Sequence, residues 1–272
     1  MGAVDVWMQM LTPKMAAEPW LASLLRWTGN PDGFAPPRLS ATLAAMDEAG
    51  VDIGLISAWR GPEGVLISNE ETAAHVDAEP TRLRGLLSVD LNDPAGAACD
   101  VRQWTGDGRF VGVRIVPWLW DLPPNDRRYY PVYAACVEAG VPFCTQIGHT
   151  GPLKRSEPGR PIPYLEDVLL DFPELVVVGG HVGFPWVNEV VSLARKFPNF
   201  YVDTSAYALH RLPPDFVHFM KDDGRKRMMF GTNWPMLTPK RCLKGLDTIG
   251  LDEEAKTLFL SDNARRVFKL GS

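Results

Sequence analysis

The sequence lacks the features that mark several classes of protein. Four of its 272 residues are cysteines, and Cys99, Cys136, Cys144 and Cys242 form no closely spaced pair. Zinc knuckles and disulfide frameworks need such pairs, so neither is expected, and the cysteines are predicted to be buried structural residues. No apolar run approaches the ~18 residues that a membrane helix needs, so no membrane partner is expected.

An excess of basic residues is also missing. Lys and Arg total 28 against 33 Asp and Glu, a formal net charge of −5, which excludes a broad phosphate-binding surface and a nucleic-acid partner. The 24 glycines and 24 prolines are dispersed, which predicts many turns and no low-complexity region. The first residues carry Asp5 and no cationic segment, so no secretory signal and a cytoplasmic location are expected.

Familiar catalytic signatures are absent as well. The chain has no Gly-x-Ser-x-Gly elbow, no glycine-rich phosphate loop and no cysteine placed convincingly beside a histidine. These absences argue against serine-elbow hydrolysis, cysteine nucleophiles and nucleotide-dependent chemistry.

The chain does contain a repeated alternation of short apolar runs and helical patterns. Continuous Val, Ile and Leu runs are typical of parallel strands buried on both faces. Eight strands over about 250 residues predict a single (β/α)8 barrel spanning residues 1–272, whereas a doubly wound sheet would carry a glycine-rich turn after its first strand. The predicted strands are Ala3–Trp7, Val51–Ala58, Arg82–Val89, Phe110–Pro117, Pro142–Ile147, Leu175–Gly180, Phe200–Thr204 and Met228–Gly231.

Helical spacing and turn-rich segments fill the intervals. Leu39, Leu43 and Met46 lie at i, i+4 and i+7, and further helices are predicted over Pro131–Gly140 and Asp252–Leu270. Residues 27–37 and 148–163 are rich in Gly and Pro and each precedes a helix. In a barrel such loops form the mouth, so both are candidate substrate loops.

Four motifs carry a family resemblance. The segments GGHVGFPW (179–186), NFYVDTSAY (199–207), FGTNWPML (230–237) and SDNARRVF (261–268) stand in the order found in the amidohydrolase-related superfamily. The chain most resembles the branch that contains aminocarboxymuconate-semialdehyde decarboxylase and pyrone-dicarboxylate hydrolase. That resemblance implies a (β/α)8 barrel, small carboxylate substrates, frequent dimers and an active site at the C-terminal ends of the strands.

The sequence departs from that family where the metal ligands stand. The family's Asp-x-His-x-His reads Asp5-Val6-Trp7-Met8-Gln9 here, and its strand 8 aspartate is replaced by Asn233. Its strand 5 histidine corresponds either to Gln146 or to His149. Tryptophan cannot ligate, and neutral amides are weak ligands for Zn²⁺ or Mn²⁺, so no metal cofactor is expected unless His149, His181 and Asp203 recruit an ion differently.

Histidines and an aspartate at strand ends are the candidate catalytic residues. His181 follows Gly179-Gly180 directly, matches the family's proton-transferring histidine, and has a side chain suited to acid–base work near neutral pH. Asp203 ends the next strand and is its predicted partner, although it could instead cap the following helix. His149 lies between glycines in the loop after strand 5 and is a third candidate.

Cations, amides and aromatics near the strand ends are the candidate substrate-binding residues. Arginine pairs with a carboxylate through two parallel hydrogen bonds, and a charged Arg114 inside a strand would be costly without a partner. Amides can stabilise an oxyanion where relatives use a metal. The predicted set is Trp7, Gln9, Arg60, Arg114, Gln146, Trp186 and Asn233.

Together these features predict a metal-independent hydrolase that acts on a small cyclic or aromatic carboxylate. Decarboxylation by the same scaffold is the first alternative, and a catalytically silent barrel that binds a small ligand is the second. Contact between His181 and Asp203 would favour an enzyme. Filling of the barrel mouth by Trp7 and Trp234 would favour the silent barrel.

Overall fold

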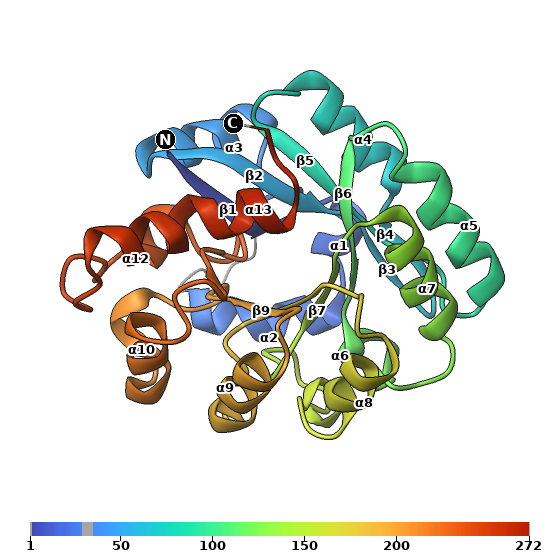
Figure 1. The fold of residues 1–272 in the computed structure, drawn as a ribbon. Coiled ribbons are helices and arrows are strands. Elements are labelled where there is room, and N and C mark those ends of the chain that lie inside the picture. The colour runs from blue at the N-terminus through green and yellow to red at the C-terminus, as the bar shows by residue number, and fades with distance from the viewer. Residues whose placement is uncertain (1, 29–34, 272) are drawn as a thin grey trace.

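The computed structural model describes residues 2–28 and 35–271, and it contains an eight-stranded parallel sheet curled into a barrel (Figure 1). The strands of this barrel follow one another around it in chain order, so each pairs with its neighbour in sequence. All eight predicted strands are confirmed, with ends that differ from the prediction by at most two residues. They are β1 (Ala3–Met8), β2 (Val51–Ser57), β5 (Leu83–Leu87), β6 (Phe110–Ile115), β7 (Phe143–Gln146), β8 (Val177–Gly180), β9 (Phe200–Asp203) and β10 (Met228–Met229).

The barrel closes between its first strand and the segment after its last. The amide of Val6 donates to the carbonyl of Phe230 at 3.0 Å, and the amide of Asn233 donates to the carbonyl of Trp7 at 2.7 Å. Gln9 adds a third bond of 3.0 Å to the carbonyl of Trp234. These bonds satisfy main-chain groups that would otherwise form the open edges of the sheet.

Helices surround the barrel, as the alternating sequence predicts. Their starts follow ordinary capping chemistry: Ser68 and Glu71 form a capping box, and Asp93 and Asp252 cap the helices that follow them. The main helices are α1 (Pro13–Ala16), α2 (Pro19–Thr28), α3 (Leu39–Glu48), α4 (Asn69–Ala78), α5 (Pro94–Trp104), α6 (Pro117–Trp120), α7 (Tyr130–Ala139), α8 (Tyr164–Asp171), α9 (Val187–Lys196), α10 (Pro214–Lys221), α11 (Pro239–Cys242), α12 (Glu253–Thr257) and α13 (Asn263–Val267).

Three details differ from the sequence-based expectations, and part of one expectation falls outside the described residues. Directly after β2 the chain forms an antiparallel hairpin, β3 (Trp59–Gly61) with β4 (Gly64–Ile67), that was not predicted. A π-helical stretch, Leu258–Asp262, divides the predicted C-terminal helix. Residues 29–34 of the predicted substrate loop lie outside the described residues. Cys99 is exposed, whereas the other three cysteines are buried, and all four are free.

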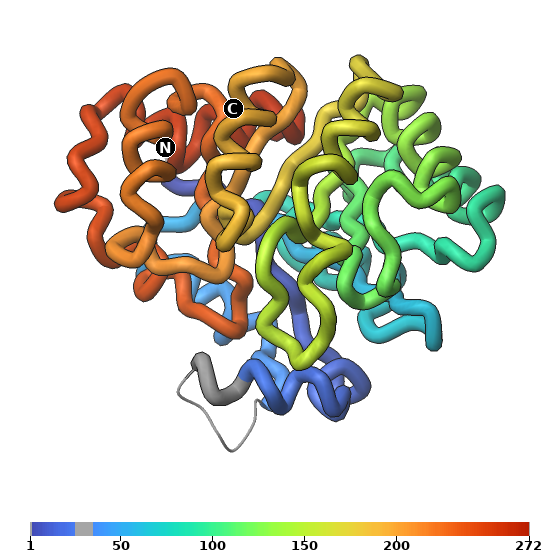
Figure 2. The backbone as a smooth tube through the Cα atoms, turned by 90° about the horizontal axis from the view of Figure 1, so that it is seen from below, coloured from blue at the N-terminus to red at the C-terminus, as the bar shows by residue number. Residues whose placement is uncertain are grey.

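The two ends of the barrel are covered by different segments. At the N-terminal ends of the strands, Ala264 and Val267 of α13 and Phe268 directly after it pack with strand residues such as Val4 and Val178. At the opposite end, α1 and α2 lie beside the loop that follows β7 (Figure 2). There Leu24 packs so tightly on Gly151 that a Cβ on that glycine would lie 2.2 Å from Leu24 Cδ2.

Among the described residues no helix is long and apolar enough to cross a bilayer.

Candidate active site

The centre of the barrel, near the C-terminal ends of its strands, is occupied by the indole of Trp7. This side chain is 1% exposed and reaches from β1 to β8, where a Cβ on Gly180 would lie 2.2 Å from its ring. The ring centroid lies 4.7 Å from that of His181. A glycine at position 180 is therefore required because any larger residue would collide with the indole.

Arg114 also lies against this indole. Its guanidinium carbon is 3.8 Å from the Trp7 ring centroid, a cation–π contact, and its Nη2 donates to the carbonyl of Val6 at 2.6 Å. Its Nε and Nη1 are buried without a protein partner. Burial lowers the pKa of Arg114 to about 10, so the side chain keeps its charge at neutral pH. It therefore offers two unpaired nitrogen donors, Nε and Nη1, to an anion.

His181 leaves β8 in a strained turn that aims its ring toward Trp7. His181 and Val182 have φ angles of 74° and 53°, and such values are uncommon, above all for a β-branched residue. The Nδ1 atom of His181 lies 2.6 Å from the hydroxyl of Ser205. Burial, and then the nearby Arg114 charge, lower the pKa of His181 to about 3, so its imidazole is neutral near pH 7.

Asp203 ends β9 with its carboxyl fully buried. Oδ1 accepts the amide hydrogen of Ser205 at 2.8 Å, whereas Oδ2 has no protein partner. Burial raises the pKa of Asp203 to about 6, although contacts with Ser205 and the charge of Arg114 oppose that rise. The predicted Asp203–His181 pair is therefore connected through Ser205, which the sequence reasoning did not single out. Its signal was the Asp-x-Ser spacing within the NFYVDTSAY motif.

Asp5 has a structural role in this end of the barrel. Its carboxylate accepts hydrogen bonds from the Thr232 hydroxyl at 2.6 Å, the Thr232 amide at 3.0 Å and the Trp7 amide at 3.1 Å. Burial raises its pKa to about 7 despite these bonds. Asp5 thereby ties β1 to the segment after β10 and fixes the backbone from which Trp7 projects.

The three predicted amides are largely used by the protein itself. Gln9 Nε2 donates to Asn233 Oδ1 at 3.1 Å, and Gln146 Nε2 lies 3.1 Å from each of the carbonyls of Ile147, Gly148 and His149. The Oε1 atoms of Gln9 and Gln146 remain buried and without a protein partner. Gln146, not His149, therefore occupies the buried position at the end of β7.

These side chains do not fit a divalent metal ion. The positions at which the resemblance to the amidohydrolase-related superfamily implies metal ligands hold an indole and neutral amides here, and Asn233 Oδ1 already accepts a hydrogen bond. Within residues 2–28 and 35–271, no three His, Cys, Asp or Glu side chains are grouped as a metal site would need. Zn²⁺ and Mn²⁺ prefer imidazole and anionic oxygen, so this donor set offers them little.

Three predicted site residues lie away from this centre. The His149 side chain is exposed, and its amide donates to the carbonyl of Phe184. Arg60 lies on the β3–β4 hairpin and pairs with Asp90, with its Nε buried and unpaired. Trp186 is partly exposed, and the guanidinium of Arg160 lies 5.9 Å from its ring.

The other tryptophans of this region are part of the packing. Trp234 donates from Nε1 to the hydroxyl of Thr42 at 3.1 Å. It therefore packs toward α3 and does not fill the barrel mouth, in contrast to the alternative that its sequence position allowed. Trp20 of α2 lies 5.0 Å from Trp118 and 6.3 Å from Trp59, ring centroid to centroid. These contacts attach α2 to the barrel rim.

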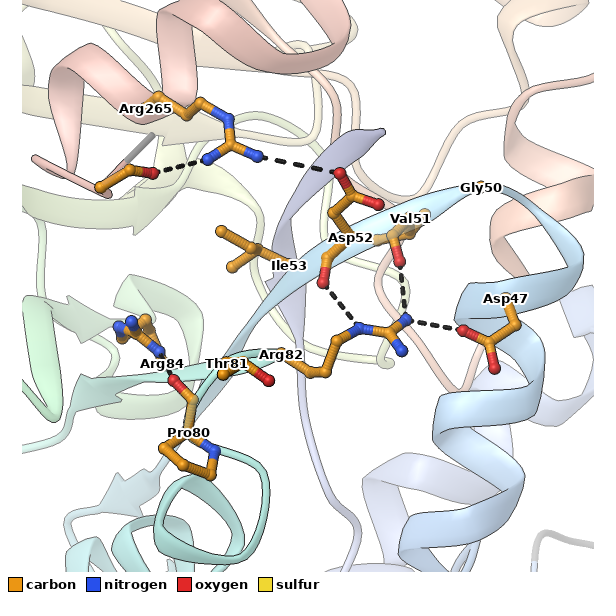
Figure 3. A pocket seen from close by; sticks show the side chains of 11 residues that line it. Asp47, Gly50, Val51, Asp52, Ile53, Pro80, Thr81, Arg82, Arg84 and Arg265 are labelled. Carbon is orange, nitrogen blue, oxygen red and sulfur yellow. Dashed lines mark hydrogen bonds and ion pairs between the residues drawn. The ribbon is translucent and has the colours of Figure 1, made fainter. Parts of the chain in front are cut away.

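A pocket of about 680 Å³ lies at the opposite end of the barrel, beside the starts of β2 and β5 (Figure 3). Its arginines are occupied by protein groups: Arg82 binds Asp47 and two carbonyls, and Arg265 binds Asp52 and the carbonyl of Gly271. Arg84 donates to the carbonyls of Pro80 and Leu83. Residues at this end of a barrel usually serve stability, and these contacts agree with that role.

Unpaired buried polar atoms gather at the C-terminal end. Among the described residues, eleven buried side-chain atoms have no hydrogen-bond partner in the protein. All of them lie in the last two residues of a barrel strand or in the segment that follows one. They belong to Trp7, Gln9, Trp59, Arg60, Arg114, Thr145, Gln146, Thr150, Asp203 and Thr204. Buried polar groups are nearly always paired, so this end of the barrel has unmet capacity to bind a polar ligand.

Comparisons with known proteins agree with the fold and the sequence motifs. The sequence model of the amidohydrolase family matches residues 28–270. Gamma-resorcylate decarboxylase of Rhodococcus jostii (strain RHA1) is 23% identical over 255 residues, which cover 75% of each chain.

Two solved structures resemble the whole barrel. An uncharacterized TIM-barrel protein from Bordetella bronchiseptica has a TM-score of 0.84 and 26% identity over 99% of both chains. A dihydroxybenzoic acid decarboxylase from Polaromonas sp. JS666, solved with bound manganese and the inhibitor 2-nitroresorcinol, has a TM-score of 0.75 and 16% identity over 99% of this chain and 97% of that one. The chain belongs to the amidohydrolase family of enzymes, in a branch whose relatives include decarboxylases.

Proposed function

We propose that this protein is a carboxy-lyase that releases CO2 from a small aromatic carboxylate without a bound metal ion. The preference for decarboxylation over the hydrolysis expected from sequence rests on the relatives, which are named for decarboxylation of gamma-resorcylate and dihydroxybenzoic acid. The absence of a metal ion is proposed because Trp7, Gln9 and Asn233 stand at the positions where the family resemblance implies metal ligands. Residues 1–272 would form one catalytic domain.

The observation that carries the proposal is the group of unpaired polar atoms around Trp7. Arg114 has two unpaired nitrogen donors in a water-poor setting, and such donors bind a carboxylate or a phenolate far more strongly than they would in water. The flat indole beside them gives an aromatic ring an apolar surface. A small anionic aromatic acid is therefore the ligand that this end of the barrel suits best.

Decarboxylation also needs a proton for the ring carbon that loses CO2. Asp203 is the acid of the site because its pKa is raised to about 6, and His181 is the member of the pair whose ring lies against Trp7. Turnover requires protonated Asp203, so kcat should fall as the pH rises through about 6.

The test is release of CO2 from a panel of hydroxylated benzoates, including 2,6-dihydroxybenzoate and 5-carboxyvanillate, assayed with chelator and again with Mn²⁺. We expect activity that chelator leaves unchanged. Arg114→Lys keeps the charge but loses the planar fork and should weaken substrate binding, whereas Arg102→Lys, which changes an exposed pair with Glu138, should not.

Two outcomes would contradict the proposal. Activity that appears only with added Mn²⁺ would restore metal-assisted chemistry. Binding of the benzoates without any CO2 release, measured by calorimetry beside the assay, would favour the silent ligand-binding barrel, which the filling of the barrel centre by Trp7 also suits.

A further inference from the structure

Three residues at the ends of two neighbouring strands form a line that leads from the buried Asp203 carboxyl to the His181 imidazole beside Trp7. Ser205 Oγ lies 2.6 Å from His181 Nδ1, and the Ser205 amide donates to Asp203 Oδ1 at 2.8 Å. A Cβ on Gly231 would lie 3.0 Å from Asp203 Oδ1 and 3.2 Å from Ser205 Cβ, so the Asp203 carboxyl and the Ser205 side chain both pack beside Gly231. The Ser205 side chain is also close enough to the Asp203 carboxyl to lower its pKa.

His181 alone is a poor proton donor in this setting. Its pKa is lowered to about 3, so near neutral pH it carries one hydrogen and no charge. A neutral imidazole can give up that hydrogen readily only if its other nitrogen receives one at the same time. The other nitrogen here is the one that faces Ser205.

We propose that Ser205 is a positioning residue that relays a proton between Asp203 and His181 Nδ1, so that His181 Nε2 delivers the proton of the decarboxylation. This inference rests on the proposed function for its chemistry, but the relay itself is a property of the protein without substrate.

The relay conserves protons and electrons. Asp203 gives its proton to Ser205 Oγ, Ser205 gives its own to Nδ1, and Nε2 gives its hydrogen to the ring carbon. The electron pair of the breaking C–C bond forms the new C–H bond, and the carboxylate leaves as CO2. Asp203 is left as a carboxylate and takes a proton from water before the next turnover.

The direction of the relay depends on pH because Asp203 titrates among charged and titratable neighbours. Arg114 and Asp5 face this group from β6 and β1, and Cys144 faces it from β7. Below about pH 6 protonated Asp203 donates to Ser205, which donates to Nδ1, so the hydrogen of His181 is on Nε2. Above that pH the carboxylate accepts from the Ser205 hydroxyl, and Nδ1–H donates to Ser205.

The experiment follows the His181 tautomer in the free protein by two-bond proton–nitrogen NMR correlations. We expect the hydrogen to move from Nε2 to Nδ1 with a midpoint near pH 6, with no imidazolium formed. Ser205→Ala and Asp203→Asn should each abolish this change, and Ser205→Thr should restore it. Ser57→Ala is the matched control, because Ser57 is a buried serine at the end of β2 that bonds only the carbonyl of Ala58 in the structure described.

The relay would be overturned if His181 kept one tautomer from about pH 5 to pH 8, or if the change persisted in Ser205→Ala. If wild type releases CO2, Ser205→Ala should lower kcat by about 10²–10⁴-fold with KM nearly unchanged, and an unchanged kcat would also overturn it. If wild type releases no CO2, the proposed function fails while the NMR result still decides the relay.

Discussion

Replacement of Trp7 by alanine probes the centre of the barrel directly. The indole is 1% exposed, packs on Gly180 and carries the cation–π contact with Arg114. Truncating a buried tryptophan costs about 3–5 kcal/mol, and a desolvated cation–π contact is worth about 2 kcal/mol of such a loss. Since domains are stable by about 5–15 kcal/mol, Trp7→Ala should remove a large share of the free energy of unfolding.

The same substitution should change the chemistry of His181. Water entering the vacated space would relieve the burial that holds the pKa of His181 near 3, so this pKa should rise toward its ordinary value of about 6.5. Added indole should bind in the space and partly reverse both effects, because apolar cavities of this kind accept aromatic ligands.

Urea unfolding followed by circular dichroism measures the stability, and proton NMR titration measures the pKa of His181, assigned with His181→Gln. Trp104→Ala is the matched control, because Trp104 is a partly exposed tryptophan of α5 whose cationic neighbour, Arg109, lies 6.0 Å from its ring. If Trp7→Ala lost no more stability than this control, or left the pKa of His181 near 3, the indole would not be what fills and dries the centre.

Three further predictions follow from buried groups at the same end. The pKa of Asp5 is about 7 in the folded state and near 3.8 in the unfolded state, so the free energy of unfolding should fall by up to about 4 kcal/mol as the pH rises between those values. Asp5→Asn should remove this dependence of the unfolding free energy on pH, measured by urea titrations, while Asp121→Asn, at an exposed position, should not. Gly180→Ala should lower the free energy of unfolding by about 3 kcal/mol or more because its methyl group would collide with Trp7, whereas Gly106→Ala should not. A double-mutant cycle that combines Gly180→Ala with Trp7→Ala should show strong coupling between the two positions. One equivalent of Mn²⁺ or Zn²⁺ should leave the melting temperature unchanged, and a rise of several degrees with stoichiometric metal in elemental analysis would contradict the reading of the amides.

The barrel could be predicted from sequence because its signal is repeated and local. Strands buried on both faces produce continuous apolar runs, and Gly140 ends α7 with a φ of 63°, as a helix-terminating glycine should. The β3–β4 hairpin escaped prediction because strands of three and four residues carry too little pattern.

The candidate site could be predicted only in part. The alternation of a strand correctly places Trp7 on the inside, but the reach of its ring to Gly180 depends on a distance across the barrel. The sequence indicated a pair of His181 and Asp203, yet the contact runs through Ser205 because the strained turn at His181 directs Nδ1 to that hydroxyl. His149 is exposed in the structure, and its glycine neighbours in the sequence do not determine where a loop side chain points.

The bond between Asp5 and Thr232 has a consequence for how the chain is made. These partners are 227 residues apart, so β1 has no closing partner until Thr232 has left the ribosome. Until then β1 and the strand made last are open edges of the sheet, and such edges are templates for aggregation. A chain truncated before residue 232 should therefore accumulate as insoluble material, and late closure of the ring should set the pace of refolding.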